Sequence, residues 1–141
     1  MKKWMLYGAY GYTGKLLVHE AISRGHKPVL AGRSAEKLVP LAEKLDLDYT
    51  ILDLKEEISL VDSLNDFDLV FHAAGPFKYT SAPMVKACLK TGTNYVDITG
   101  EIPVFEENFK YHSQAQDVGI VIISGVGFDV VPTDCLAKYV S

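Results

Sequence analysis

Short, nearly continuous apolar runs recur along the chain and are separated by longer amphipathic segments. Such runs are typical of strands that are covered on both faces of a parallel sheet. We expect strands at Lys3–Gly8, Lys27–Gly32, Asp48–Asp53, Asp68–Gly75, Thr93–Ile98 and Gly119–Ser124.

The amphipathic segments place apolar residues three and four positions apart, which predicts helices with one buried face. We expect one helix from near Thr13 to a stop at Gly25, one after an N-cap at Ser34, and others at Glu56–Leu64, Pro83–Lys90 and Pro103–Asp117. In the last of these, Phe105, Phe109 and Ala115 are expected to face the core. The final stretch FDVVPTDCLAKYV is interpreted as the start of a further helix.

This alternation predicts a doubly wound parallel sheet, the Rossmann type of α/β fold, with about six strands and helices on both faces. The expected strand order is 3-2-1-4-5-6. A chain of 141 residues fits one domain, and it carries no repeat, linker or low-complexity tract. Ligands of such sheets bind beyond the carboxyl ends of the strands, so the loops that follow the strands are the candidate sites.

Composition and charge narrow the classes of partner. The net charge is −4 and no basic block occurs, which disfavours nucleic acid. No apolar run approaches the roughly 20 residues of a membrane span, and the N-terminal residues lack the pattern of a secretory signal. Cys88 and Cys135 form no redox or metal motif, so we expect reduced thiols and a cytoplasmic protein. The histidines show no metal-ligand spacing, and no metal site is expected.

The stretch YGAYGYTGKLL joins the first strand to the first helix and contains Gly8, Gly11 and Gly14. Its G-x-x-G-x-x-G spacing is a variant of the dinucleotide-binding fingerprint. Gly8 would allow a sharp turn, Gly11 the close approach of a pyrophosphate, and Gly14 tight packing of the helix on the sheet. The alternative is an ordinary strand–helix turn that is rich in glycine.

The residues between these glycines belong to the same candidate site. Backbone N–H groups at the start of the helix, near Thr13, would face the phosphates of a bound dinucleotide. Tyr10 and Tyr12 would cover the pyrophosphate, or they are exposed loop residues without a role in binding.

The end of the second strand indicates which dinucleotide is bound. Domains that bind NAD usually place a carboxylate there to accept hydrogen bonds from the ribose 2′-hydroxyl. This chain instead has Arg33 and Ser34, with Lys37 one helical turn further on. A guanidinium suits a 2′-phosphate, which predicts NADP(H). Alternatively, Arg33 is a solvated charge and Ser34 only a helix cap.

Two further strand ends border the same expected crevice. Asp53 follows the third strand and is a candidate for the adenine amine, or else a turn residue. Ala73, Ala74, Gly75 and Pro76 follow the fourth strand, where small side chains would let the backbone approach the cofactor. A tight turn without a ligand explains the same residues equally well.

Polar side chains also follow the fifth strand, at Asp97, Thr99 and Glu101. Asp97 is a candidate for holding a ribose hydroxyl or polarising a substrate, and its alternative role is a strand-end turn. For Glu101 we favour a charge at a helix N-terminus over a ligand contact. The catalytic residues stay unassigned.

Four stretches of the chain together resemble the NADP-binding domain of the saccharopine dehydrogenase-like oxidoreductases. They are GAYGYTGKLL, LAGRSAEKL, HAAGPFKYTSAPMVKACLKTGTNYVDITGE and GVGFDVVPTDCLA. The resemblance covers nearly the whole chain in order. It implies a nicotinamide dinucleotide across Gly8–Gly14, at Arg33 and along Ala73–Pro76, with hydride transfer near Asp97–Glu101. The position before AAGPF is often a small or amide residue in the family, whereas it is His72 here.

The family usually has a second domain that shapes the substrate site and the dimer contact, and this chain does not contain it. The resemblance therefore implies a domain that positions NADP(H) for hydride transfer with a small-molecule substrate in the complete protein. We expect the chain by itself to bind NADPH without turnover, and the apolar residues of its final stretch to favour a homodimer. The alternative hypothesis is a non-enzymatic NADP(H)-binding redox sensor.

Overall fold

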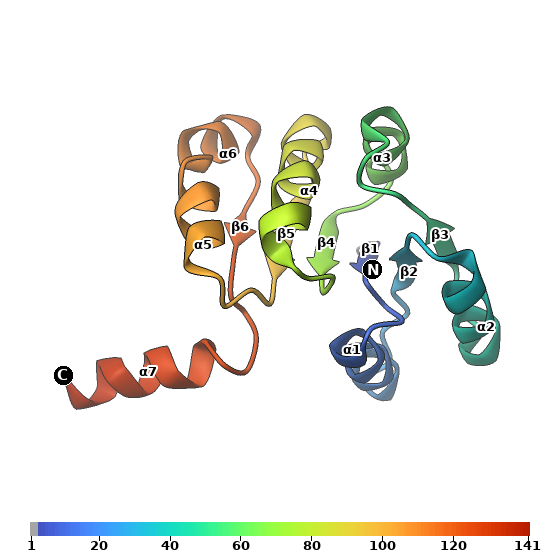
Figure 1. Ribbon diagram of the computed structural model, residues 1–141, viewed down its shortest axis with the longest axis horizontal. Coiled ribbons are helices and arrows are strands. Elements are labelled where there is room, and N and C mark those ends of the chain that lie inside the picture. The colour runs from blue at the N-terminus through green and yellow to red at the C-terminus, as the bar shows by residue number, and fades with distance from the viewer. Residues whose placement is uncertain (1–2) are drawn as a thin grey trace.

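The computed structural model describes residues 3–141 and confirms the doubly wound α/β fold (Figure 1). A six-stranded parallel sheet has the predicted order β3-β2-β1-β4-β5-β6. The strands are β1 (Trp4–Tyr7), β2 (Val29–Gly32), β3 (Tyr49–Ile51), β4 (Leu69–His72), β5 (Asn94–Asp97) and β6 (Ile122–Ile123). Each strand lies inside its predicted range and is shorter than predicted.

The register aligns the carboxyl ends of the central strands. Tyr7 of β1 lies opposite Ala31 of β2 and His72 of β4, and His72 lies opposite Asp97 of β5. The loops that follow these strands therefore leave the sheet at one edge, which is where a doubly wound sheet binds its ligands.

Helices cover both faces of the sheet (Figure 1). They are α1 (Tyr12–Ser23), α2 (Ala35–Leu45), α3 (Glu57–Leu64), α4 (Phe77–Thr91), α5 (Ile102–Phe109), α6 (His112–Val118) and α7 (Val131–Val140). On one face Leu6 and Leu30 pack with Val18 of α1 and Leu38 of α2. On the other, Val70 and Tyr95 pack with residues of α3, α4 and α6, so the sheet is buried on both sides as its apolar strands predict.

Two predicted helices are corrected. Helix α4 begins at Phe77 rather than at Pro83, which lies inside it. Phe77 and Ser81 near its start are buried, and Glu101 caps its N-terminus, so the helix extends six residues before the proline.

The predicted helix Pro103–Asp117 is two helices, α5 and α6, which meet at 110–111. Val104 and Asn108 face inward, whereas Phe109 is 76% exposed, contrary to the prediction. The break changes the helical phase, which brings Ala115 of α6 back into the core as expected.

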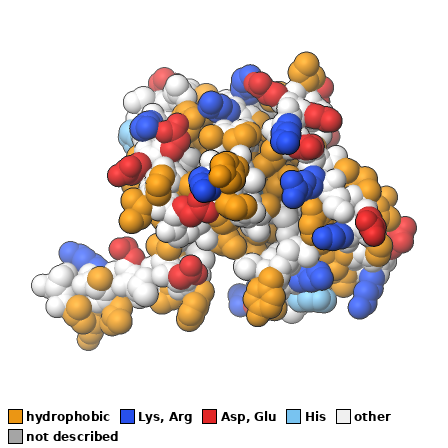
Figure 2. All heavy atoms as spheres, in the orientation of Figure 1, with side chains coloured by type: hydrophobic (Ala, Val, Ile, Leu, Met, Phe, Trp, Pro, Cys, Tyr) orange, Lys and Arg blue, Asp and Glu red, His pale blue; other side chains and the backbone are white. Residues whose placement is uncertain are grey.

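Helix α7 confirms the predicted C-terminal helix and extends away from the rest of the domain (Figure 1). None of its residues is buried, and Figure 2 shows hydrophobic side chains along it. Within residues 3–141, no helix combines the length and apolar character needed to cross a membrane.

Candidate functional site

A pocket of about 460 Å³ lies at the carboxyl edge of the sheet, where β1 and β4 lead to helices on opposite faces. It is lined by Tyr7, Gly8, Tyr10, Gly11, Gly32, Arg33, Asp53, Leu54, Lys55, Ala73, Ala74, Gly75, Pro76, Tyr79 and Thr80. The lining comes from the ends of four strands and from the first turn of α4. This place is the topological switch point of the sheet, the usual ligand site of the fold.

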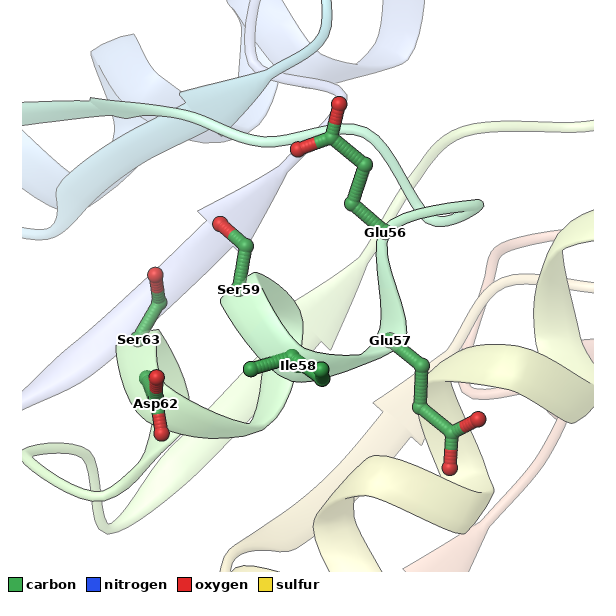
Figure 3. A pocket seen from close by; sticks show the side chains of 6 residues that line it. All are labelled: Glu56, Glu57, Ile58, Ser59, Asp62 and Ser63. Atoms are coloured by element: carbon green, nitrogen blue, oxygen red, sulfur yellow. The ribbon is translucent and has the colours of Figure 1, made fainter.

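Figure 3 shows a different hollow, on the exposed face of α3, lined by Glu56, Glu57, Ile58, Ser59, Asp62 and Ser63. The carboxylates of Glu56 and Glu57 point away from each other, and Glu57 pairs with Lys90. Its polar groups do not converge on one point, so it is not a candidate for small-molecule binding. Among residues 3–141, no group of three or more histidine, cysteine or acidic residues is placed to hold a metal ion.

The glycine loop makes the turn that its sequence predicts. Gly8 has a φ of +89°, and a Cβ there would lie 2.9 Å from the backbone of Ala73 and Ala74. A Cβ at Gly14 would lie 2.1 Å from the carbonyl oxygen of Gly8. Side chains at either position would push α1 and the β4–α4 loop away from the end of β1. The sharp turn at Gly8 and the close packing at Gly14 are confirmed.

The N-terminus of α1 opens beside the pocket. Its N-cap is Gly11, which has no side chain to accept hydrogen bonds from the first-turn N–H groups. The N–H of Gly11 itself bonds the carbonyl of Gly8 at 3.0 Å. The unmet donors and the helix dipole make this end of α1 suited to a phosphate.

The N-terminus of α4 borders the same pocket, but an internal carboxylate closes it. The two oxygens of Glu101 accept hydrogen bonds from the N–H groups of Phe77 and Lys78, at 2.7 and 2.9 Å. Glu101 is also the N-cap of α5. It is thus a charge at a helix N-terminus, as favoured from the sequence, although the helix that it caps with its side chain is α4.

Arg33 directly follows β2, is exposed and lines the pocket. Lys55, beyond the end of β3, is a second cation in the lining. Ser34 is the N-cap of α2, but its hydroxyl makes no capping bond, and its N–H donates to the Tyr10 hydroxyl oxygen at 3.3 Å. Lys37 is exposed on α2 and does not line the pocket.

The residues that follow β3 line the side of the pocket where the adenine was expected to bind. One carboxylate oxygen of Asp53 accepts a hydrogen bond from the N–H of Lys55 at 3.0 Å, which confirms its role as a turn residue. Beneath it the Tyr7 hydroxyl donates to the carbonyl of Leu52 at 3.2 Å. Burial, with smaller contributions from Tyr10 and Asp53, raises the pKa of Tyr7 to about 12, so this phenol is neutral at physiological pH.

The β4–α4 loop, Ala73–Pro76, forms the wall opposite β2. The N–H of Ala73 donates to the carbonyl of Tyr7 at 2.8 Å, and the Thr80 hydroxyl donates to the carbonyl of Ala74 at 2.7 Å. The loop is thereby tied to β1 and to α4, and its small side chains leave the backbone exposed toward the pocket.

Asp97 does not reach the pocket. Its side chain is fully buried and accepts four hydrogen bonds: from the N–H groups of Thr99 and Gly125, both at 3.0 Å, and from the hydroxyls of Tyr95 and Ser124, at 2.8 and 3.2 Å. In this structure Asp97 organises the loops after β5 and β6 from beneath, instead of presenting a carboxylate to a ligand.

His72 belongs to the same buried network. Its Nδ1 lies 3.1 Å from the Tyr95 hydroxyl, and the rings of Tyr7, Phe77 and Tyr95 pack edge-on against it. Burial lowers the pKa of His72 to about 3, so the imidazole is neutral. Burial also raises the pKa of Tyr95, and Asp97 adds to this effect.

The predicted site residues that line the pocket are Gly8, Tyr10, Gly11, Arg33, Asp53, Ala73, Ala74, Gly75 and Pro76. The others lie outside the lining: Tyr12, Thr13 and Gly14 in the first turn of α1, Ser34 and Lys37 at the start of α2, and Asp97 in the buried network. The other lining residues were not among the predicted site residues: Tyr7, Gly32, Leu54, Lys55, Tyr79 and Thr80. The first four lie at or next to predicted strand ends, which is a usable signal, whereas Tyr79 and Thr80 lie in the part of α4 that was not predicted.

These features agree with the comparisons with known proteins. The family model described as the saccharopine dehydrogenase NADP-binding domain matches residues 4–123. The chain belongs to this family. The cofactor of the domain is accordingly NADP(H), and the residues present fit it: an uncapped helix N-terminus for phosphate and Arg33 at the tip of β2 face one pocket.

The individual relatives that match this domain are longer proteins. A saccharopine dehydrogenase-like oxidoreductase from Bos taurus is 32% identical over 151 residues, which cover 92% of this chain and 35% of the relative. A trans-acting enoyl reductase from Mycobacterium bovis is 35% identical over 138 residues, which cover 92% of this chain and 33% of the relative. The domain thus spans about a third of the length of these curated relatives.

Among solved structures, the apo saccharopine dehydrogenase (L-Glu forming) from Saccharomyces cerevisiae resembles this domain with a TM-score of 0.77 and 22% identity. The match covers 92% of this chain and 28% of that chain. At this identity the likeness supports the fold alone.

Proposed function

We propose that the domain positions NADP(H) for hydride transfer with a small-molecule substrate in a saccharopine dehydrogenase-like oxidoreductase. Bound NADP(H) supplies the hydride chemistry. The residues of this chain bind and orient it: the first turn of α1 holds the pyrophosphate, Arg33 pairs with the 2′-phosphate, and Ala73–Pro76 support the nicotinamide half. The observation that carries the proposal is that α1 and Arg33 offer positive charge at two points of one pocket.

Two other features support redox chemistry in the complete protein. The matched relatives are named as an oxidoreductase and an enoyl reductase, and neither name favours the non-enzymatic sensor that the sequence left open. Apolar side chains are exposed near the starts of the helices that follow β1, β4 and β5, at Tyr12, Leu16, Tyr79 and Ile102. They support contacts with further protein that would complete a substrate site, and a homodimer stays a prediction.

The test compares two cations near the same strand end. Arg33→Ala removes the pocket guanidinium, whereas Lys37→Ala removes an exposed ammonium one turn further on α2. A hydrogen bond to a charged group contributes about 1.5–3 kcal/mol, so Arg33→Ala should weaken NADPH binding by roughly 10- to 150-fold. NADH binding by Arg33→Ala and NADPH binding by Lys37→Ala should change little.

Isothermal titration calorimetry with both cofactors and all three proteins measures these affinities. Tighter binding of NADH than of NADPH by the unmodified chain would overturn the proposal. An equal loss of NADPH affinity in both variants would show that Arg33 acts only through general positive charge.

A further inference from the structure

Tyr10 occupies a defined position between the glycine loop and the tip of β2. Its ring packs against the backbone of Gly32, where an added Cβ would lie 2.5 Å from the ring carbon Cε1. The ring also contacts the apolar cluster beneath α1 and α2. These contacts keep the side chain away from the open N-terminus of α1 and direct it toward α2.

The hydroxyl of Tyr10 lies at the start of α2, one residue beyond Arg33 in the chain, and Tyr10 and Arg33 line the same pocket. Its oxygen accepts the N–H of Ser34 at 3.3 Å, at the start of α2. Among residues 3–141, no acceptor takes the hydroxyl proton, and the Ser34 hydroxyl makes no capping bond. A hydroxyl that accepts a hydrogen bond becomes a better donor, because hydrogen bonds in a chain polarise one another.

An anion next to Arg33 is the acceptor that complements this arrangement. We propose that the Tyr10 hydroxyl donates a hydrogen bond to the 2′-phosphate of NADP(H), so that Tyr10 determines cofactor specificity together with Arg33. This inference rests on the proposed function. Tyr49 provides the contrast, because it lies on β3, is 42% exposed and lines no part of the pocket.

The experiment compares Tyr10→Phe with Tyr49→Phe, because each change removes one phenolic oxygen. NADPH affinity of Tyr10→Phe should fall by about 10-fold or more, the effect of losing a hydrogen bond to a charged group. Its NADH affinity should stay within about 2-fold, since NADH lacks the 2′-phosphate, and Tyr49→Phe, a change outside the pocket, should match the unmodified chain for both cofactors. Equal losses for NADPH and NADH in Tyr10→Phe would assign the hydroxyl a structural role only and overturn the inference.

A second measurement needs no destabilising variant. The chain carrying 3-fluorotyrosine at position 10 is titrated with adenosine 2′,5′-bisphosphate and with adenosine 5′-monophosphate, and the ¹⁹F resonance is followed. A shift with the bisphosphate alone supports the contact, and the same shift with both nucleotides contradicts it.

The outcomes separate this inference from the proposed function. If Arg33→Ala loses the preference for NADPH while Tyr10→Phe retains it, the inference fails and the proposed function stands. If the unmodified chain binds neither dinucleotide, the proposed function fails, and the inference fails with it.

Discussion

Helices α1 and α4 begin at the same edge of the sheet, after the neighbouring strands β1 and β4, and both border the pocket. Their first turns are satisfied differently. The N-cap of α1 is Gly11, which leaves its donors to a ligand, whereas the donors of α4 bind the carboxylate of Glu101. Of the two dipoles that face the pocket, the one at α1 is available to an external phosphate.

The same contrast extends to the strands behind these helices. On the β1–β2 side, Arg33 and Tyr10 present polar groups to the pocket. On the β4–β5 side, His72, Tyr95 and Asp97 bond one another beneath the surface. Polar residues at strand ends thus serve a ligand on one side and the internal structure of the loops on the other.

The largest expected effect comes from blocking the N-terminus of α1. Gly11→Val places a branched side chain over the first turn of α1, starting from a Cβ only 3.2 Å from the carbonyl of Gly8. Loss of two phosphate hydrogen bonds should weaken NADPH binding by roughly 100-fold or more. The change lies in a surface turn, so circular dichroism should show an intact fold, and calorimetry gives the affinity.

Gly11→Ala is the graded control, because it adds the same Cβ without the branches, and its loss of affinity should be smaller. A folded Gly11→Val protein with unchanged NADPH affinity would mean that the phosphates do not bind at α1, and the contrast with α4 would then have no functional meaning.

An intermediate effect is expected from His72 in the buried network, as a pH dependence of the free energy of unfolding. The folded-state pKa of His72 is about 3, below the ordinary 6.5, because the ring is buried. Between these values the unfolded chain takes up a proton that the folded domain does not, so stability falls as the pH falls through this window. At pH 5 the cost is about 2 kcal/mol relative to pH 8.

Urea denaturation between pH 8 and pH 5 measures this cost. In His72→Asn the contribution should disappear, whereas His26→Asn, a change at an exposed histidine, should keep it. A nuclear magnetic resonance titration of the folded domain that places the pKa of His72 near 6.5 would contradict the prediction without relying on either variant.

The fold and the part of the site around α1 and the tip of β2 could be predicted, because their sequence signals are local. Each strand is an apolar run, the turn between β1 and α1 contains the glycines that it needs, and Arg33 directly follows β2. These features depend on residues that are adjacent in the chain, which a sequence displays directly.

The contacts around the start of α4 and the end of β5 could not be predicted, because they join residues that are far apart in the chain. Glu101 caps a helix that begins 24 residues earlier, and Asp97 bonds Gly125, 28 residues later. Pro83 also suggested a helix start, since proline is common in the first turn, and the cap that places the start at Phe77 gives no local signal. Asp97 was therefore a candidate ligand contact, whereas Glu101 was already favoured as a charge at a helix N-terminus.

The smallest expected effect comes from weakening the carboxylate cap at the N-terminus of α4. Glu101→Gln keeps the size of the side chain but replaces one acceptor oxygen by an NH₂ group that faces an N–H donor of α4. The lost charge and hydrogen bond should lower the free energy of unfolding by about 1 kcal/mol. Glu106→Gln on the exposed part of α5 is the matched control and should leave stability unchanged.

Calorimetry on the same variants tests whether α4 could replace α1. NADPH affinity of Glu101→Gln should stay within about 2-fold of the unmodified chain, because the phosphates are assigned to the first turn of α1 and Glu101 does not line the pocket. Markedly tighter NADPH binding in Glu101→Gln, absent in Glu106→Gln, would show that Glu101 competes with a phosphate at α4. That result would move the phosphate site from one helix to the other, because a carboxylate opposes a phosphate only where both face the same donors.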